Sequence, residues 1–185
     1  SGKTFVKKIS CSLPGLYLIE NEVFNDSRGS LSEVYKDEEV YDTLGFKNAL
    51  ELEVESIKGV LRGLHYQLDP YAQAKIVRVV SGKILDIVVD IRKSSTTFGK
   101  WCSNVLGNEF RQQLYIPRGF AHGYYTLEEN TKLIYKLDNI YDRPSYRGIR
   151  YDDKSLDIDW SLLENPIMSE QDLALPNLSK AEVFE

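Results

Sequence analysis

The chain has only two histidines, and each follows closely behind an Arg-Gly pair. The first context is V-L-R-G-L-H over residues 60–65, and the second is R-G-F-A-H over residues 118–122. Histidine exchanges a proton readily near neutral pH, because its unperturbed pKa is about 6.5. Arginine holds anions through its planar guanidinium. We interpret His65 as a candidate general base and Arg62 as a candidate anion clamp; the alternative is that both histidines are structural.

The spacing of Arg62 and His65 sets a geometric requirement. Residues 60–67 are rich in apolar side chains and predict a β-strand, on which successive side chains point to opposite faces. Three positions apart, Arg62 and His65 would face opposite sides of a regular strand. Gly63 permits a bend or bulge between them. If both side chains serve one site, the sequence predicts an irregularity at Gly63.

Short strand-like segments dominate the rest of the chain. Their even spacing predicts an all-β sandwich or barrel. Ser81-Gly82 is a turn signal between two β-branched runs. A short helix is expected over 37–45, ending at Gly45, and S-E-Q-D at 169–172 predicts the start of another. The other strand-like segments are 15–20, 30–36, 50–56, 75–80, 83–92, 101–106, 111–117, 122–127 and 131–137.

Composition restricts the function further. We expect one domain over residues 1–185, because this length supports one full core. The net charge of -5 argues against a nucleic-acid or membrane-surface binder. We see no secretory signal at the N-terminus and no apolar run that could span a bilayer. Cys11 and Cys102 lack a Cys-x-x-Cys spacing, so no disulfide framework is expected and a cytoplasmic location fits.

The second histidine lies in I-P-R-G-F-A-H (116–122), which resembles the second motif of the cupin superfamily of small β-barrels. The first cupin motif fits at His65, but Gln67 replaces its second histidine and Lys75 lies near its expected glutamate. Divalent metals prefer imidazole and carboxylate ligands, whereas an ammonium can itself stabilise an oxyanion. We predict metal-free carbonyl chemistry. The alternative is a metal held weakly by His65, His122 and water.

Taken together, the motifs closely resemble the dTDP-4-dehydrorhamnose 3,5-epimerase family of nucleotide-sugar enzymes. The resemblance runs in one register from about residue 15 to about residue 175. It rests on V-F-N-D-S-R-G (23–29), G-V-L-R-G-L-H-Y-Q (59–67), A-K-I-V-R-V-V-S-G (74–82), D-I-V-V-D-I-R-K-S-S-T-T-F-G-K-W (86–101), Q-L-Y-I-P-R-G-F-A-H-G (113–123), L-I-Y-K (133–136) and Y-D-D-K-S-L-D-I-D-W (151–160).

The resemblance implies a cupin-type double-stranded β-helix, or jelly-roll barrel, with a few short peripheral helices. It also implies inversion at C3 and C5 of a nucleoside-diphosphate 4-keto-6-deoxy sugar, without a cofactor. His65 matches the family's base and Asp172 the carboxylate that orients it. Lys75 matches the lysine beside the C4 oxygen, and Tyr135 the proton donor on the opposite face of the sugar. Asp86 matches an acidic residue near the base.

The substrate-binding residues are inferred in the same way. Arg28 and Arg62 match family arginines near the phosphates and sugar, and Glu33 and His122 match substrate-contacting residues. Tyr141 matches an aromatic ring that stacks on the nucleobase, a contact suited to any flat base. The resemblance further implies a homodimer and dTDP-rhamnose biosynthesis.

Each assignment has a plainer alternative. Arg28 could decorate a turn, and Lys75 could guard a sheet edge. Tyr135 could be core, because it alternates with two leucines on its strand. Asp172 could be only a carboxylate in the first turn of a helix.

The chain departs from the family where the nucleotide is bound. Leu50-Glu51-Leu52 stands in place of Gln-Asp-Asn, Tyr146 in place of a glutamate, and Gln171 in place of a basic residue. These departures leave the nucleobase and the final sugar open. They keep a single-carbon epimerase, a keto-sugar ketoisomerase and an inactive sugar-binding or assembly module as alternatives.

Overall fold

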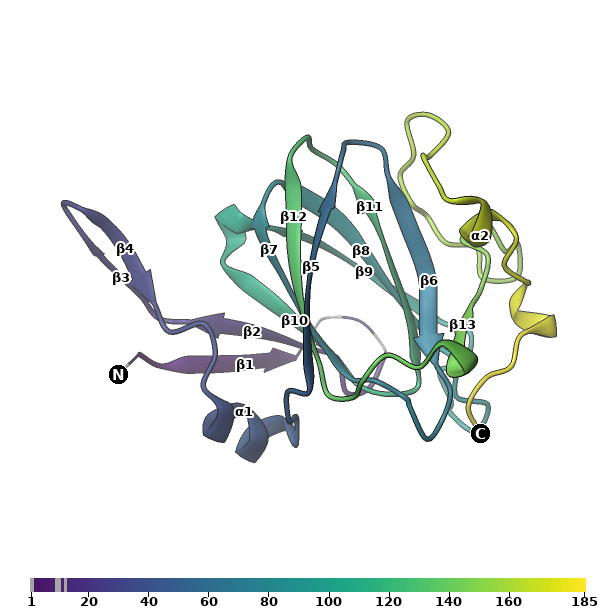
Figure 1. The fold of residues 1–185 in the computed structure, drawn as a ribbon, viewed down its shortest axis with the longest axis horizontal. Coiled ribbons are helices and arrows are strands. Elements are labelled where there is room, and N and C mark those ends of the chain that lie inside the picture. The colour runs from purple at the N-terminus through teal and green to yellow at the C-terminus, as the bar shows by residue number, and fades with distance from the viewer. Residues whose placement is uncertain (1, 9–10, 12) are drawn as a thin grey trace.

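The computed structural model describes residues 2–8, 11 and 13–185, and these residues fold as two packed β-sheets with a projecting hairpin (Figure 1). One sheet has six strands: β1 (Thr4–Lys8), β2 (Tyr17–Asn21), β10 (Gln112–Ile116), β7 (Lys75–Ser81), β12 (Thr131–Leu137) and β5 (Leu50–Ser56), in that order. The other has five: β13 (Tyr146–Gly148), β6 (Leu61–Gln67), β11 (Phe120–Thr126), β8 (Lys83–Asp90) and β9 (Trp101–Gly107). The all-β prediction is therefore confirmed.

The main core lies between the two sheets. On β7, Val77 and Val79 point into this core, whereas Ile76 points to the opposite face and packs beneath the first helix. This alternation places every second residue of a strand in the interior. The outer face of the five-stranded sheet is covered by the C-terminal segment, which contributes Leu156 and Trp160 to a second apolar cluster.

Two short α-helices lie outside the sheets. Helix α1 (Asp37–Leu44) has three acidic residues in its first turn and ends at Gly45, whose φ is 68°, as the sequence predicted. Helix α2 (Glu170–Leu173) starts where predicted, with the Ser169 hydroxyl accepting a hydrogen bond from the Asp172 N–H at 3.1 Å. Three 3-10 turns complete the elements: η1 (Asn108–Phe110), η2 (Arg143–Ser145) and η3 (Leu178–Lys180). No helix in the described parts of the chain has the length and apolar character to cross a membrane.

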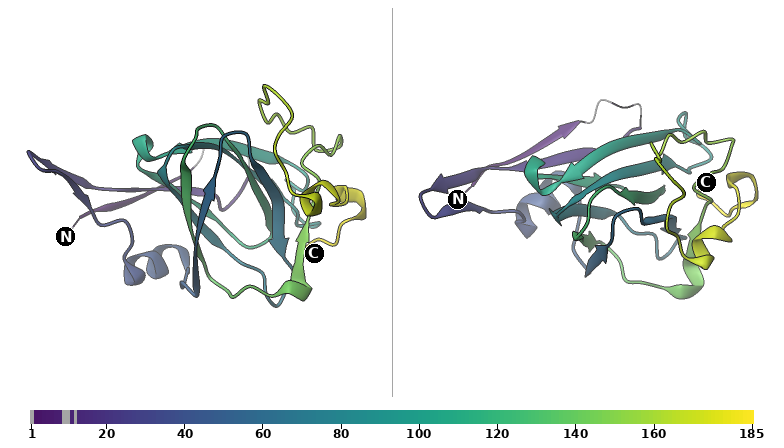
Figure 2. Two further views of the ribbon diagram at one scale, coloured as in Figure 1. Left: turned by 45° about the horizontal axis from the view of Figure 1, so that its top comes forward. Right: turned by 90° about the horizontal axis from the view of Figure 1, so that it is seen from above.

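A separate two-stranded ribbon projects from the body of the molecule. It consists of β3 (Val23–Asp26) and β4 (Gly29–Ser32), and Figures 1 and 2 show it extending away from the two sheets. The strand predicted over 30–36 was too long, because β4 ends at Ser32 and the chain then leads into α1.

The turn at Ser81-Gly82 joins two strands that are not paired with each other. β7 belongs to the six-stranded sheet and β8 to the five-stranded sheet. Gly82 has a φ of 77°, and a Cβ atom there would lie 2.7 Å from the Thr131 Cα atom. The glycine therefore allows the chain to cross between the sheets rather than to form a hairpin.

The expectation that the chain has no disulfide was wrong. Cys11 and Cys102 form a disulfide, with their Cα atoms 6.1 Å apart. Cys102 lies on β9 in the main core, and Cys11 packs against the same core from the segment before β2. Sequence spacing alone could not reveal this pairing, because 91 residues separate the two positions.

Strand β6 is irregular at Gly63, as predicted. His122 of β11 lies opposite His65, and Tyr124 lies opposite Arg62. An advance of two residues along β11 therefore corresponds to three residues along β6, which is a β-bulge. Gly63 has a φ of 119°, and its peptide bond to Leu64 is cis. The irregularity allows Arg62 and His65 to line one pocket.

We predict that Gly63→Ala lowers the free energy of unfolding by about 3 kcal/mol or more, since strain and overpacking add. The new Cβ would lie 2.6 Å from the Gly123 Cα atom and 2.8 Å from the His122 carbonyl oxygen. Gly45→Ala is the matched control, because Gly45 also has a positive φ but open space around it. Equal losses in a denaturant titration of the two variants would show that no close packing exists at Gly63.

Candidate active site

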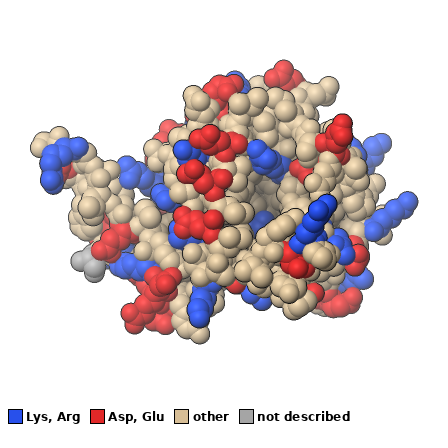
Figure 3. Space-filling view, in the orientation of Figure 1, with Lys and Arg blue, Asp and Glu red and all other residues tan. Residues whose placement is uncertain are grey.

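The largest described pocket opens between the two sheets, on the face seen in Figure 3, and has a volume of about 660 Å³. Figure 3 shows this face hollowed near its centre, with Lys and Arg side chains around the hollow and acidic side chains over β5. The volume suits a ligand the size of a cofactor or nucleotide. Seven predicted site residues line the pocket: Arg62, His65, Lys75, His122, Tyr135, Tyr141 and Asp172.

His65 and Asp172 form a hydrogen-bonded pair at the pocket wall. The His65 Nε2 atom lies 2.6 Å from Asp172 Oδ1, and the Gly63 N–H donates to Asp172 Oδ2 at 3.0 Å. Burial alone would raise the pKa of Asp172, but the hydrogen bond with His65 and the Gly63 N–H outweigh it and hold that pKa below its usual value. Asp172 thus stays ionised and fixes the orientation of the imidazole, whose other nitrogen is left for chemistry.

A second histidine–carboxylate pair lies deeper. The His122 Nε2 atom is 2.5 Å from Asp86 Oδ2, and both side chains are almost completely buried. Burial lowers the pKa of His122, with Asp86 opposing the shift. Because His122 favours the neutral form, it suits hydrogen bonding to a substrate better than carrying a fixed charge. The sequence assigned Asp86 to the neighbourhood of the base; the structure pairs it with His122.

Lys75 starts β7 and points into the pocket. β7 lies between β10 and β12, so the alternative that Lys75 guards a sheet edge is wrong. Burial lowers the pKa of its ammonium to about 8, with the Asp86 charge opposing the shift. Its Nζ atom lies 5.9 Å from the centroid of the Tyr135 ring. A cation with a pKa this close to neutrality can hold an oxyanion and still share its proton.

The lowered pKa of Lys75 predicts an alkaline limit to activity. Above about pH 8 the ammonium loses its proton, so we expect kcat/KM to fall about tenfold for each further pH unit. The measurement is a pH–rate profile of the wild type beside that of Lys75→Met. The variant should be slower at pH 7 and should not show the decrease of kcat/KM above pH 8. A wild-type kcat/KM that stays constant up to pH 10 would contradict the role of Lys75.

Tyr135 faces the two histidines from the opposite sheet. Its ring makes an edge contact with His122, with the ring centroids 5.8 Å apart. Burial raises the pKa of the Tyr135 hydroxyl well above its ordinary value. Tyr135 therefore keeps its proton at neutral pH, which a proton donor requires. Its position on the pocket wall argues against a role in the core alone, although its ring also packs against the main core.

Aromatic rings form the rim of the pocket. Tyr146 lies beside His65 with the ring centroids 5.1 Å apart, and Tyr141 lies 5.8 Å from Tyr146. Tyr141 is 56% exposed, so its ring is free to receive a flat ligand. Burial raises the pKa of Tyr146, so that side chain is neutral.

Of the five residues that the resemblance marks as departures from the family pattern, all but Glu51 line this pocket. Leu50 and Leu52 face it from β5, where Leu52 lies directly opposite Tyr135 on β12. Tyr146 and Gln171 complete the set. One wall is therefore apolar beside the predicted proton donor.

Sequence motifs missed several further lining residues, among them Gln73, Tyr124 and Ser169. Tyr124 lies in the strand-like segment 122–127, and its position two residues after His122 is the available signal. Gln67, which replaces a cupin metal ligand, is 2% exposed. Its side chain donates to the carbonyl oxygens of Tyr71 and Ile140 and accepts from the Asp142 N–H. Gln67 thus supports the loop that carries Tyr141.

Arg28 and Glu33 are not brought to this pocket. Arg28 lies in the projecting hairpin, where its guanidinium pairs with Asp26 and is 88% exposed. Glu33 accepts a hydrogen bond from the Gly2 N–H and pairs with Lys36. Within one copy of the described chain, neither side chain lines the pocket of His65.

Comparisons with known proteins agree with this geometry. The family model of dTDP-4-dehydrorhamnose 3,5-epimerase matches residues 10–180. A dTDP-4-dehydrorhamnose 3,5-epimerase of Shigella flexneri is 42% identical over 178 residues, covering 95% of this chain and 98% of that protein. The crystal structure of a dTDP-6-deoxy-D-glucose-3,5-epimerase from Legionella pneumophila, in complex with dTDP-4-keto-L-rhamnose, superposes with a TM-score of 0.91 at 36% identity and covers 96% of this chain and 94% of that one.

A more distant likeness concerns a different outcome of the reaction. A 3'-monoepimerase from Streptomyces bikiniensis, in complex with dTDP-quinovose, is 29% identical, with a TM-score of 0.86. The superposition covers 91% of this chain and 86% of the other protein's chain. The same fold thus occurs in an enzyme named for epimerisation at one carbon.

Proposed function

Because the chain belongs to the dTDP-4-dehydrorhamnose 3,5-epimerase family, we propose that it inverts C3 and C5 of a nucleoside-diphosphate 4-keto-6-deoxy sugar. The substrate we propose is dTDP-4-keto-6-deoxyglucose, and the product dTDP-4-dehydrorhamnose, a step in dTDP-rhamnose biosynthesis. The observation that carries the proposal is the arrangement of the pocket. The His65–Asp172 pair lies on one wall and Tyr135 on the facing wall, and the Lys75 ammonium points into the same pocket.

The reaction begins with removal of a proton next to the C4 ketone. His65 accepts this proton, and Asp172 stabilises the imidazolium that results. The electron pair of the broken C–H bond moves into the ring and places negative charge on the C4 oxygen. The Lys75 ammonium lies in the same pocket and stabilises that charge.

Inversion is completed by protonation from the opposite face of the sugar. Tyr135 supplies this proton from β12, across the pocket from His65 on β6. The new C–H bond takes the electron pair of the enolate, and the C4 carbonyl forms again. His65 and Tyr135 then return to their starting protonation states through exchange with solvent.

The remaining lining residues suit the nucleotide. Arg62 is exposed at the pocket rim, where its guanidinium can pair with phosphate oxygens. His122 hydrogen-bonds a sugar hydroxyl, and the exposed ring of Tyr141 stacks on the base.

The alternative outcome is epimerisation at one carbon. Its support is the likeness to the 3'-monoepimerase, together with the apolar side chains of Leu50 and Leu52 at the pocket wall. A ketoisomerase needs a base but no proton donor on the opposite face, and the position of Tyr135 therefore favours an epimerase.

The test of the proposed function is the configuration of the product. Purified protein is incubated with dTDP-4-keto-6-deoxyglucose, and the sugar is analysed by NMR after chemical reduction of the ketone. Inversion at both C3 and C5 is expected. Inversion at one carbon alone would establish the single-carbon alternative, and a ketone that moves to C3 would establish the ketoisomerase.

We further propose that the enzyme is a homodimer in which the β3–β4 hairpin of each copy reaches the pocket of the other. The hairpin projects from the body, and it exposes Phe24 and Leu31 by 46% and 65%. This arrangement would bring Arg28 to a substrate, which the single chain does not do.

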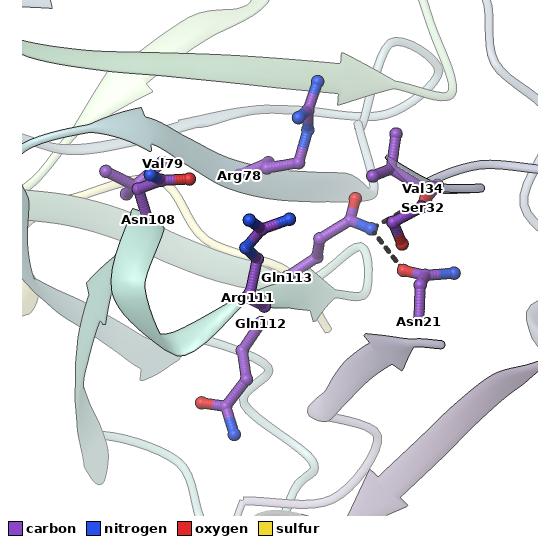
Figure 4. A pocket seen from close by; sticks show the side chains of 9 residues that line it. All are labelled: Asn21, Ser32, Val34, Arg78, Val79, Asn108, Arg111, Gln112 and Gln113. Carbon is purple, nitrogen blue, oxygen red and sulfur yellow. Dashed lines mark hydrogen bonds between the residues drawn. The ribbon is translucent and has the colours of Figure 1, made fainter. Parts of the chain in front are cut away.

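A polar pocket at the base of the hairpin supports the same proposal. Figure 4 shows it lined by Arg78 and Arg111, with Gln113 hydrogen-bonded to Asn21 at 3.0 Å. The guanidinium of Arg111 is exposed here and donates a hydrogen bond to the Ser30 hydroxyl of the hairpin at 3.0 Å. A second copy packed on this face would cover these polar groups.

Complementation between subunits tests the homodimer. Arg28→Ala and His65→Ala are each expected to be poorly active. If Arg28 serves the partner's pocket, co-refolding equal amounts recovers about a quarter of wild-type activity, because half of the dimers then hold one intact site. No recovery, in a mixture confirmed as dimeric by light scattering, would contradict the shared site.

We propose a cytoplasmic location from the chemistry of the substrate alone, because the Cys11–Cys102 disulfide removes the support that the cysteines were expected to give. The diphosphate of the proposed substrate is multiply charged, and burying such charges in a bilayer is strongly unfavourable. An enzyme that uses it must therefore share the compartment in which nucleoside triphosphates are available.

A further inference from the structure

Tyr146 lies beside the proposed base, and no step of the proposed reaction uses it. Its ring packs against the His65 imidazole, with the ring centroids 5.1 Å apart and an angle of 43° between the ring planes. Both side chains are partly buried and line the same pocket. Tyr146 is also one of the positions at which the chain departs from the family pattern, so the family resemblance assigns it no function.

The pairing of β13 with β6 explains why the two rings meet. Gly148 lies directly opposite His65, and Tyr146 lies directly opposite Gln67. Gly148 has no side chain to place beside the imidazole, and a Cβ atom there would lie 2.7 Å from the Leu64 carbonyl oxygen. The diagonal neighbour of a residue on a paired strand is still within reach of an aromatic side chain. Tyr146 therefore fills the space that the glycine leaves open beside His65.

The backbone of Tyr146 is held in place on both sides. Before it, the Asp142 side chain caps the turn η2 and accepts a hydrogen bond from the Ser145 N–H at 3.1 Å. After it, the Arg147 guanidinium donates to the Tyr146 carbonyl oxygen at 2.9 Å, and its Nε atom lies 3.0 Å from Glu182 Oε1. A side chain whose own position is fixed in this way can fix the position of its neighbour.

The hydrogen bond to Asp172 fixes only part of the orientation of the His65 ring. It holds the Nε2 atom 2.6 Å from Asp172 Oδ1. A single hydrogen bond does not prevent the imidazole from turning about the line between these two atoms. Such a turn would move the Nδ1 atom away from the sugar, and a small misplacement of a reacting atom is costly in rate. The Tyr146 ring blocks this turn on one side of the imidazole.

Tyr146 can pack here without placing a charge beside the base. Burial raises the pKa of its hydroxyl, and the Asp172 charge raises it further. The side chain therefore stays neutral while the imidazole gains and loses a proton. The glutamate that the resemblance expects at this position would instead bring a second carboxylate close to Asp172, and it has no ring to pack against His65.

We propose that Tyr146 is a positioning residue, which holds the His65 imidazole so that its free nitrogen faces the hydrogen to be removed from the sugar. Tyr146 acts through contact alone, and no bond to it forms or breaks. The inference rests on the proposed epimerase function, because His65 must act as the base. Proton removal by His65 precedes both deuterium exchange and inversion, so loss of the Tyr146 ring should slow both by the same factor.

Tyr146→Ala tests the proposal, and Tyr146→Phe is the conservative variant that keeps the ring. Both rates are measured in deuterated water, as deuterium entry into the sugar and as inversion of its configuration. We expect Tyr146→Ala to lower kcat about tenfold for exchange and inversion alike, with KM changed less than about threefold. Tyr146→Phe should restore kcat to within about twofold of the wild type, because the ring rather than the hydroxyl contacts His65.

Tyr151→Ala is the matched control for loss of an aromatic contact as such. Tyr151 forms a tilted pair with Trp160, with the centroids 6.5 Å apart, in the cluster on the outer face of the five-stranded sheet. It lies outside the pocket that the described chain forms, so its loss should reduce thermal stability and leave kcat unchanged. Tyr141→Ala should instead raise KM, because the Tyr141 ring is proposed to bind the nucleobase.

An NMR measurement reports on the contact without any turnover. The chain has only two histidines, so the imidazole signals of His65 can be assigned by comparison with His65→Ala. In Tyr146→Ala the His65 ring-proton signals should shift, because the ring current of Tyr146 is lost, and should broaden as the imidazole samples several orientations. The signals of His122 should stay in place, as should those of both histidines in Tyr151→Ala.

The proposal is overturned if Tyr146→Ala matches Tyr151→Ala in kcat, if Tyr146→Phe is as slow as Tyr146→Ala, or if the loss appears in KM alone. A wild-type protein that neither exchanges nor inverts a 4-keto-6-deoxy sugar nucleotide would overturn the proposed function instead. The NMR comparison would then still show whether Tyr146 orients His65, and unchanged His65 signals in Tyr146→Ala would contradict that orientation.

Discussion

Replacing His65 with alanine is expected to abolish both deuterium exchange and epimerisation, with a loss of about a thousandfold in kcat. No other side chain on β6 can take the place of the imidazole held by Asp172 at 2.6 Å. The measurement is the rate at which deuterium from solvent enters the sugar, followed by NMR or mass spectrometry. Exchange by Tyr135 alone is negligible, because its hydroxyl keeps its proton at neutral pH.

The control for His65→Ala is its fold. The His65 side chain is 22% exposed and makes no contribution to the main core, so the variant should retain most of its thermal stability. Asp172→Asn should keep the packing but weaken the base, with a smaller loss than His65→Ala. A folded His65→Ala protein with unchanged exchange would show that the base lies elsewhere.

Replacing Tyr135 with phenylalanine is expected to separate the two half-reactions. Inversion should fall about a hundredfold, because the opposite-face proton donor is lost. Exchange should persist, because His65 and Lys75 remain to form the enolate and return the proton to the same face. Deuterium should therefore enter the sugar with retention of configuration.

Tyr125→Phe is the appropriate control, because Tyr125 on β11 packs in the cluster on the other face of the five-stranded sheet and its hydroxyl lies outside the pocket. Equal losses of exchange and inversion in Tyr135→Phe would mean that Tyr135 binds the sugar rather than protonating it. Unchanged inversion would assign the donor to another residue that lines the pocket.

Sequence alone predicted the parts of the fold that depend on local pattern. Helix α1 with its stop at Gly45 and the cap at Ser169 were recognised because their signals lie within a few residues. The irregularity at Gly63 was predicted from a geometric conflict between Arg62 and His65, and the register of β6 with β11 confirms it.

Long-range features could not be predicted in this way. The separation of β7 and β8 into different sheets depends on the close approach of Gly82 to Thr131, 49 residues along the chain. The disulfide between Cys11 and Cys102 likewise depends on how the first strands pack against β9.

The site shows the same division. His65, Lys75 and Tyr135 were identified through motifs, but only the structure brings them to one pocket with Asp172, which arrives from the end of the chain. Tyr124 was missed because a tyrosine on a buried strand reads as core. Its hydrogen bond to Ser56 joins positions 68 residues apart.

The most direct test of the central claim is deuterium incorporation by the wild-type protein acting on dTDP-4-keto-6-deoxyglucose in deuterated water. The account predicts deuterium at both C3 and C5 of an inverted sugar, at a rate that His65→Ala abolishes. A folded wild-type protein that leaves both positions unlabelled would contradict it.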